Sequence, residues 1–184
     1  TQLLKTVFKD FESLAREKGI SFTLTLPRLA LSAFIDEEAM KKILSNLISN
    51  AIKYASSKAS VKLLPFNSDD LVFNIECEND GFVIPESDRE KIFEPFYRIK
   101  ETAKEAGSGI GLPLAKSLAE LHLGTLKYIT TKDNQNLFLL SIPIHQEKEI
   151  VIGSNILATP EQEEDLPQAA TAAQDRNTKI LLVE

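Results

Sequence analysis

Three of the seven glycines in this 184-residue chain fall within five positions, at Gly107, Gly109 and Gly111. Glycine accepts positive φ and lets a ligand approach the main chain closely. The residues that follow, 113–123, have a helical pattern, and the first turn of a helix carries unpaired N–H groups and the positive end of its dipole. This turn therefore predicts a phosphate-binding site. A flexible connection is the alternative interpretation of the same glycines.

Composition limits the class of protein. The 43% of hydrophobic residues can form a packed core, and the net charge of −6 argues against a nucleic-acid partner. The single cysteine, Cys77, excludes an intramolecular disulfide framework and a four-cysteine zinc site. No run of 18 apolar residues occurs, so the sequence predicts no membrane-spanning helix.

The periodicity of the apolar residues predicts an alternation of helices and strands. Helices are expected at residues 1–18, 36–54, 86–91 and 113–123. Strands are expected at residues 20–26, 60–66, 71–78, 125–131 and 137–144, with a short additional strand at 34–35. Residues 99–106 are charged and lack apolar periodicity, which predicts a mobile loop. After His145 the composition changes, and residues 158–178 are typical of a linker.

The helix predicted up to Tyr54 has a polar stripe. Asn46, Asn50 and Lys53 occupy positions i, i+4 and i+7 and share one face, with Tyr54 beside them. Asparagine is a poor residue for a helix interior. An amide oxygen suits Mg²⁺, and a lysine suits phosphate. The alternative is a solvated face opposite the core.

Two further segments have patterns that suit a ligand. In residues 78–85 a strand ends in acidic and amide side chains, and Gly81 then turns the chain. A carboxylate there can accept a hydrogen bond from an exocyclic amine such as adenine N6, although a plain hairpin turn fits equally. In residues 92–98, Phe93 and Phe96 lie near Arg98 and can cover a pocket or belong to the core.

Taken in order, these segments resemble the ATP-binding catalytic domain of bacterial sensor histidine kinases, which belongs to the GHKL superfamily and has the Bergerat fold. Residues 46–54 (NLISNAIKY) are similar to the N box and residues 79–85 (NDGFVIP) to the G1 box. Residues 92–98 (IFEPFYR) are similar to the F box and residues 107–112 (GSGIGL) to the G2 box. The resemblance implies an α/β two-layer sandwich, with one mixed, mostly antiparallel sheet and helices on one face.

The resemblance also implies roles for individual residues. Asn50 would coordinate Mg²⁺ with Asn46 close by, Lys53 and Arg98 would contact phosphates, and Tyr54 would pack near adenine and ribose. The three G2 glycines would let residues 99–106 close over the triphosphate as a lid. The ATP-binding set implied in this way comprises Asn46, Asn50, Lys53, Tyr54, Asn79, Asp80, Gly81, Ile84, Phe93, Arg98, Gly107, Ser108, Gly109, Ile110, Gly111 and Leu112.

The chain departs from the G1 pattern Asp-x-Gly-x-Gly at two positions. Asn79 occupies the aspartate position, and Val83 occupies the position of the second glycine. The Asn79 amide can still pair with adenine, or Asp80 can rotate toward the base instead. If the position of Val83 needs glycine geometry, its side chain would crowd the turn, so the departures predict a modest affinity for ATP.

The resemblance implies a function and a domain organisation. Residues 1–145 would bind Mg-ATP and supply the γ-phosphoryl group to a histidine in a dimerisation domain outside this sequence, so no catalytic residue is assigned here. Residues 146–178 would be a linker, and residues 179–184 resemble the first strand of a truncated receiver domain, as in a hybrid kinase. The parent would be a homodimer anchored in the inner membrane, with this domain in the cytoplasm.

Two other functions remain open at this point. One is a different GHKL ATPase, although such enzymes carry a catalytic glutamate one turn before the magnesium asparagine, where this chain has Asn46. The other is a degenerate nucleotide-binding or scaffold module, which the departures at Asn79 and Val83 favour.

Overall fold

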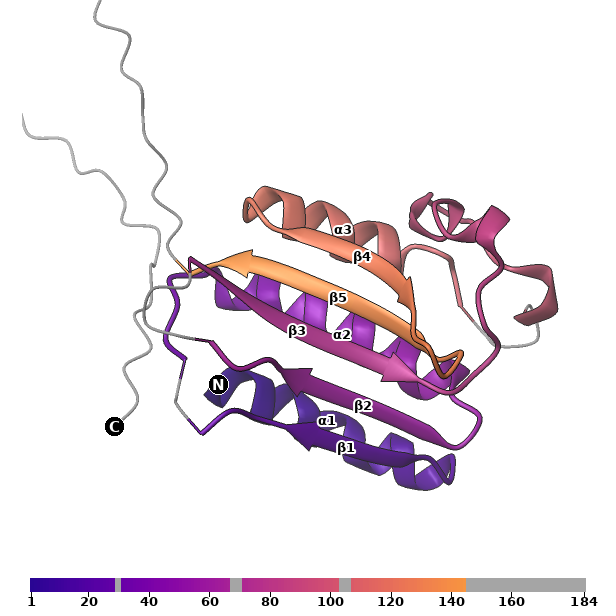
Figure 1. Cartoon of the computed structure of the whole chain (residues 1–184), viewed down its shortest axis with the longest axis horizontal. Coiled ribbons are helices and arrows are strands. Elements are labelled where there is room, and N and C mark those ends of the chain that lie inside the picture. Colours follow the sequence, from indigo (N-terminus) through magenta and orange to yellow (C-terminus); the bar gives the residue numbers. More distant parts are fainter. Residues whose placement is uncertain (29–30, 67–70, 103–106, 145–184) are drawn as a thin grey trace, which may run out of the picture.

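The computed structural model describes residues 1–28, 31–66, 71–102 and 107–144. Their strands form one five-stranded sheet in the order β1-β2-β3-β5-β4 (Figure 1). The strands are β1 (Ser21–Thr25), β2 (Lys58–Leu63), β3 (Val72–Asn79), β4 (Thr125–Thr130) and β5 (Asn136–Pro143). Only the β1–β2 pair is parallel, and the other three pairs are antiparallel. The mixed, mostly antiparallel sheet expected from the sequence is therefore confirmed.

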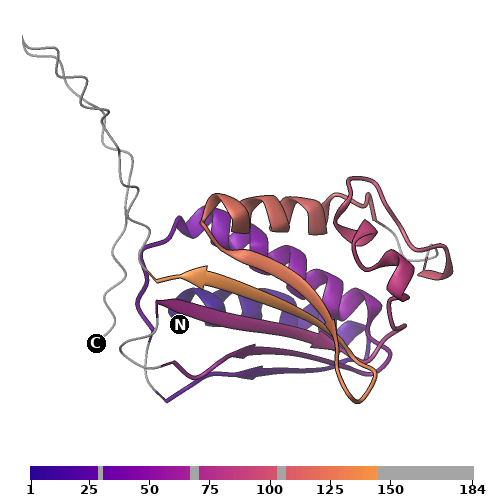
Figure 2. The ribbon, with the colours of Figure 1, turned by 45° about the horizontal axis from the view of Figure 1, so that its top comes forward.

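Three α-helices cover one face of this sheet, as Figure 2 shows. They are α1 (Gln2–Glu17), α2 (Glu37–Tyr54) and α3 (Gly111–Leu121). The apolar stripe of α2 is completely buried, with Ile43, Leu47 and Ile52 each 0% exposed. Because β1 and β2 are parallel, the chain must cross over between them, and α2 is the crossover element. The helix that carries the predicted N box is therefore the central element of the core.

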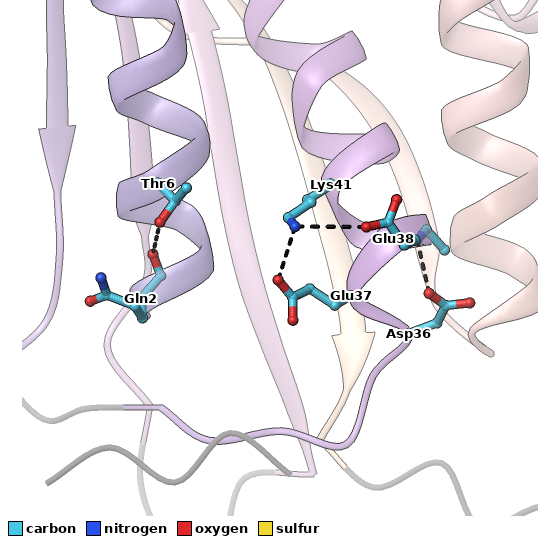
Figure 3. Close-up of polar contacts among 7 residues, drawn as sticks. Gln2, Thr6, Asp36, Glu37, Glu38 and Lys41 are labelled. Carbon is cyan, nitrogen blue, oxygen red and sulfur yellow. Dashed lines mark hydrogen bonds and ion pairs between the residues drawn. The ribbon is translucent and has the colours of Figure 1, made fainter. Parts of the chain in front are cut away.

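The start of α2 follows from local chemistry. Asp36 precedes the helix in an extended conformation, and its Oδ1 accepts a hydrogen bond from Ala39 N at 3.1 Å. Lys41 reaches back to Glu37 at 3.0 Å and to Glu38 at 3.7 Å (Figure 3). The two glutamates lie in the first turn, where negative charge favours the helix dipole. The predicted N-cap is confirmed.

The structure corrects several predicted elements. Residues 34–35 form no strand, although Phe34 N donates to Ile144 O at 3.0 Å. The helix expected at 86–91 is two separate 3-10 turns, Glu86–Asp88 and Lys91–Phe93, and a third turn, Lys100–Thr102, begins the expected loop. The helix α3 begins at Gly111, two residues before the predicted start. The predicted linker and receiver strand lie outside the described residues.

Candidate functional site

A pocket of about 260 Å³ lies where the four predicted motifs meet, beside the C-terminal half of α2 and the start of α3. Residues 80–102, which follow β3 and are magenta to pink in Figure 1, pass this end of the sheet. Twelve predicted residues line the pocket: Asn46, Asn50, Lys53, Tyr54, Asn79, Ile84, Arg98, Gly107, Ser108, Gly109, Gly111 and Leu112. Four motifs that are distant in the sequence thus converge on one cavity.

The two asparagines of α2 have different partners. Asn46 Nδ2 donates to Lys42 O at 2.8 Å, one turn back along the helix. Its Oδ1 faces the start of α3, because a Cβ added at Gly111 would lie 2.7 Å from it. Asn50 lines the pocket one turn later, and its amide takes part in no hydrogen bond with the described residues. An unengaged amide oxygen on the wall of a pocket fits a hard cation such as Mg²⁺, so Asn50 is the residue that could hold it.

Lys53 lies folded against its neighbour. Its Nζ donates to Tyr54 Oη at 2.8 Å and lies 4.4 Å from the centroid of the Tyr54 ring. A Cβ at Gly107 would approach the same Nζ at 2.6 Å. The ammonium group therefore lies directly against the glycine-rich turn, where it can contact a phosphate bound by that turn.

Gly109 joins the G2 segment to the F segment. Its φ is +73°, and its carbonyl accepts a hydrogen bond from Phe96 N at 3.0 Å. A Cβ at Gly109 would lie 2.8 Å from Phe96 C and 2.9 Å from Tyr97 O, which are backbone atoms that cannot easily move. The predicted need for glycine is met at this position, where the turn leads directly into α3.

The floor of the pocket is an asparagine pair. Asn79 is the last residue of β3, and its partner in the β3–β5 register is Asn136, the first residue of β5. Both line the pocket and are almost completely buried, at 4% and 2% exposed. Asn136 Nδ2 donates to Asn79 Oδ1 at 3.0 Å, and Gly81 N donates to the same oxygen at 3.0 Å. Asn79 is thus a fixed part of the site.

Asp80 does not line the pocket, which is a correction to the expectation that it can turn toward a base. Its Oδ1 accepts hydrogen bonds at 2.9 Å from the N–H groups of Ser56, Ser57 and Lys58, and its Oδ2 accepts from Ser57 Oγ at 2.5 Å. Partial burial acts to raise the pKa of Asp80, but the bonds from Ser57, Lys58 and Ser56 outweigh it and hold that pKa well below its usual range. Asp80 caps the connection between α2 and β2.

Three other predicted residues also lie outside the pocket lining, namely Gly81, Phe93 and Ile110. Gly81 has a structural reason for its identity, because an added Cβ would lie 1.7 Å from Tyr54 O. Val83 has an ordinary backbone, since the non-glycine residues with positive φ in the described ranges are Phe96, Leu123 and Asn134. Val83 therefore needs no glycine geometry, and it too lies outside the pocket lining.

Nine lining residues were missed by the sequence analysis. They are Ser49, Phe82, Ile92, Tyr97, Ile99, Thr102, Pro113, Asn136 and Phe138. Asn136 could have been recognised from its strand, because it lies two positions before Phe138 and shares its inward face, which a buried asparagine rarely occupies without a partner. From the sequence, Asn136 is expected in the preceding turn instead.

The remaining titratable groups do not extend the site. His122 ends α3, is 7% exposed, and its Nδ1 lies 2.7 Å from Leu118 O, so it has a structural role. Burial raises the pKa of the Cys77 thiol to about 12. Among the residues that the structure describes, no three His, Cys, Asp or Glu side chains gather as a metal site. In the same ranges, no helix is both long and apolar enough to cross a membrane.

Comparison with known proteins gives consistent matches. A family model described as "Histidine kinase-, DNA gyrase B-, and HSP90-like ATPase" matches residues 35–146. Hybrid signal transduction histidine kinase D of Dictyostelium discoideum is 31% identical in an alignment of length 173 that covers 88% of this chain and 11% of that protein. Sensor histidine kinase WalK of Bacillus subtilis is 28% identical in an alignment of length 151 that covers 80% of this chain and 24% of that protein. The chain thus spans about a quarter or less of these relatives.

Solved structures give the same result. The nucleotide-free catalytic domain of histidine kinase ThkA superposes with a TM-score of 0.67 at 27% identity, covering 79% of this chain and 94% of that domain. Full-length ShkA in complex with AMPPNP shares the fold, with a TM-score of 0.69 at 21% identity over 79% of this chain and 30% of that chain. With the family match spanning more than half of its residues, the chain belongs to the histidine kinase-, DNA gyrase B- and HSP90-like ATPases, and the relatives described here are histidine kinases.

Proposed function

We propose that this chain binds Mg-ATP in the pocket between α2, β3 and α3 and supplies the γ-phosphoryl group to a histidine in a dimerisation domain of a larger sensor kinase. The observation that carries the proposal is the contact between Lys53 and the glycine turn. The turn leads into the N-terminus of α3, Lys53 faces the turn from α2, and Asn50 lines the same pocket from α2. Phosphoryl transfer depends mainly on positioning and charge neutralisation, and these groups supply both.

Each part of the pocket has a distinct task in this proposal. Mg²⁺, when bound, would neutralise phosphate charge, and Asn50 would hold it. Lys53 and the N–H groups at the start of α3 would orient the triphosphate. Ile84 and Phe138, which are 9% and 4% exposed, give the opposite part of the pocket apolar walls for a base.

The choice of a kinase over other members of the family rests on α2. The resemblance places a catalytic glutamate of the hydrolysing enzymes one turn before the magnesium asparagine, and here Asn46 occupies that turn. Its side chain is engaged with Lys42 O and cannot act as a general base. A chain that hydrolyses ATP rapidly by itself would contradict this choice.

We also propose the wider organisation that the sequence suggests. Residues 146–178 would be a linker, and residues 179–184 would begin a receiver domain in a homodimeric parent anchored in the inner membrane, with this domain in the cytoplasm. Support comes from the relative named a hybrid histidine kinase, whose alignment covers 88% of this chain. Expression of the complete gene and detection of phosphate on an aspartate beyond residue 184 would test it.

The test of nucleotide binding is titration calorimetry with a non-hydrolysable ATP analogue, with and without Mg²⁺. Asn50→Ala should weaken binding in the presence of Mg²⁺ by about tenfold or more and change metal-free binding little, because a lost ligand acts only through the metal. Ser45→Ala is the matched control on the same helix, outside the pocket. Equal losses with and without Mg²⁺, or no binding by the unmodified chain, would overturn the proposal, and the latter would favour a scaffold.

A further inference from the structure

The hydrogen bonds around Asn136 determine the orientation of its side-chain amide. Its Oδ1 accepts from Tyr128 Oη at 2.8 Å and from Ile84 N at 3.2 Å. Its Nδ2 donates to Phe82 O at 3.0 Å and lies 3.4 Å from Gly81 O. A backbone N–H can only donate and a backbone carbonyl can only accept, so a flipped Asn136 would face mismatched groups on both sides.

This orientation determines that of Asn79 in turn. Two donors, Gly81 N and Asn136 Nδ2, both point at Asn79 Oδ1 from 3.0 Å. If the Asn79 amide were reversed, its NH₂ group would face these two donors, and both Gly81 N and one N–H of Asn136 Nδ2 would lose their acceptor. The Oδ1 atom is therefore held inside the protein, away from any ligand.

The NH₂ group of Asn79 is what remains for the pocket. Asn79 is 4% exposed and lines the cavity, and its Nδ2 donates to no group among the described residues. The apolar side chains of Ile84 and Phe138 line the same pocket. The polar group at this end of the pocket is thus a buried, oriented hydrogen-bond donor.

We propose that the pocket prefers purine nucleotides whose base carries an acceptor at position 6, as guanine and hypoxanthine do, over the 6-amino purine adenine. The inference rests on the proposed function and concerns only the base. A 6-oxo group accepts from Asn79 Nδ2, whereas the 6-amino group of adenine is a donor and would oppose it. A site built to hydrogen-bond one group discriminates against an analogue that cannot pair with it. ATP remains a ligand, because the triphosphate contacts are the same for all of these nucleotides.

The test compares ITP with ATP, which carry the same triphosphate and differ at position 6. Calorimetric titration of the complete chain in Mg²⁺ should give a dissociation constant for ITP that is about fivefold lower than that for ATP, the worth of one good hydrogen bond. Asn79→Asp should reverse the preference, because an aspartate can accept the two internal bonds with one oxygen and present the other to the pocket. GTP, whose base also carries an acceptor at position 6, should likewise bind the unmodified chain more tightly than ATP does.

Asn74→Asp is the matched control. Asn74 lies on the same strand, outside the pocket, and its Oδ1 accepts from Ser141 Oγ at 2.6 Å, which an aspartate also does. It introduces the same charge and should leave the ratio of the two affinities unchanged. Tighter binding of ATP than of ITP by the unmodified chain would overturn this inference alone, and so would an unchanged ratio in Asn79→Asp. Binding of neither nucleotide would overturn the proposed function together with it.

Discussion

Replacement of Asp80 by alanine should destabilise the fold and leave nucleotide binding intact. The side chain accepts three backbone N–H groups and one hydroxyl from residues 56–58, and it does not line the pocket. Its removal leaves the connection between α2 and β2 without these acceptors. The sequence resemblance alone would assign the opposite result, a loss of ATP binding, because Asp80 lies within the G1 box.

The size of the effect follows from these contacts. Hydrogen bonds to a charged group contribute roughly 1.5–3 kcal/mol when buried, and side-chain caps of exposed turns about 0.5–2 kcal/mol. The donors here are accessible to water, so Asp80→Ala should lower the free energy of unfolding by about 2 kcal/mol. Asp80→Asn keeps one acceptor oxygen but loses the charge, so its loss in the free energy of unfolding should be about half of that for Asp80→Ala.

Urea unfolding followed by circular dichroism measures both variants. A change of about 2 kcal/mol moves the midpoint by about 1 M, since the slope is roughly 1–3 kcal/mol per molar urea for a domain of this size. The ATP affinity of each variant, measured by calorimetry below its transition, should equal that of the unmodified chain. An unchanged midpoint combined with lost nucleotide binding would refute the assignment of Asp80 as a cap.

The pH dependence provides a second measurement of the same contact. The pKa of Asp80 is lower in the folded chain than in the unfolded chain. Its contribution to the free energy of unfolding is therefore fully present above the unfolded pKa of about 3.9, and it is lost as the pH falls through the pKa of the folded chain. The difference in stability between Asp80→Asn and the unmodified chain should therefore be largest near pH 6 and shrink below about pH 4. A difference that is constant with pH would mean that the charge of Asp80 has no role.

Two further predictions concern the turn and the core. Gly109→Ala should lower the free energy of unfolding by about 1–3 kcal/mol, because its φ of +73° and the nearby backbone of Phe96 exclude a Cβ. Gly107→Ala is the control, and it should change the stability toward urea little, because its Cβ would meet only the mobile end of Lys53. Similar losses of stability in both variants would contradict the geometry. Cys77 should resist thiol reagents at pH 8, because it is completely buried and its pKa is raised to about 12. It should react only when urea unfolds the chain. Rapid labelling under native conditions would show that this part of the core opens.

Much of the fold was predictable because its signals are local. The apolar stripe of α2 and the alternation in β3 and β5 each depend on neighbouring residues, and the structure confirms them. The errors lie where tertiary contacts decide the outcome. The helix α3 begins at Gly111 rather than at Pro113, and Gly111 lies against Asn46, which is 65 positions away in the sequence, a contact that periodicity cannot reveal.

The candidate site was predictable as a set of motifs but not as a set of contacts. Asn79 and Asp80 are adjacent in the sequence and chemically similar, yet one forms the floor of the pocket and the other caps a turn outside it. Asn79 is the last residue of β3, whereas Asp80 lies one residue beyond the strand, where its carboxylate meets the N–H groups of residues 56–58. Asn136 was missed because the strand was expected to begin one residue later; its alternation with Phe138 indicated a buried position, but its pairing with Asn79 depends on the register with β3, which no local pattern specifies.

The position of Asn136 has a consequence for the order of events during synthesis. The N–H group of Ile84 finds its side-chain acceptors, Tyr128 Oη and Asn136 Oδ1, 44 and 52 residues later in the chain, and the carbonyl of Phe82 finds its donor, Asn136 Nδ2, 54 residues later on β5. A ribosome releases α1, α2 and β3 before that strand, so the phosphate-binding groups of α2 exist in the nascent chain while the base-binding end does not. Nucleotide binding therefore reports that β5 has docked, and nucleotide can stabilise only chains that have reached this stage.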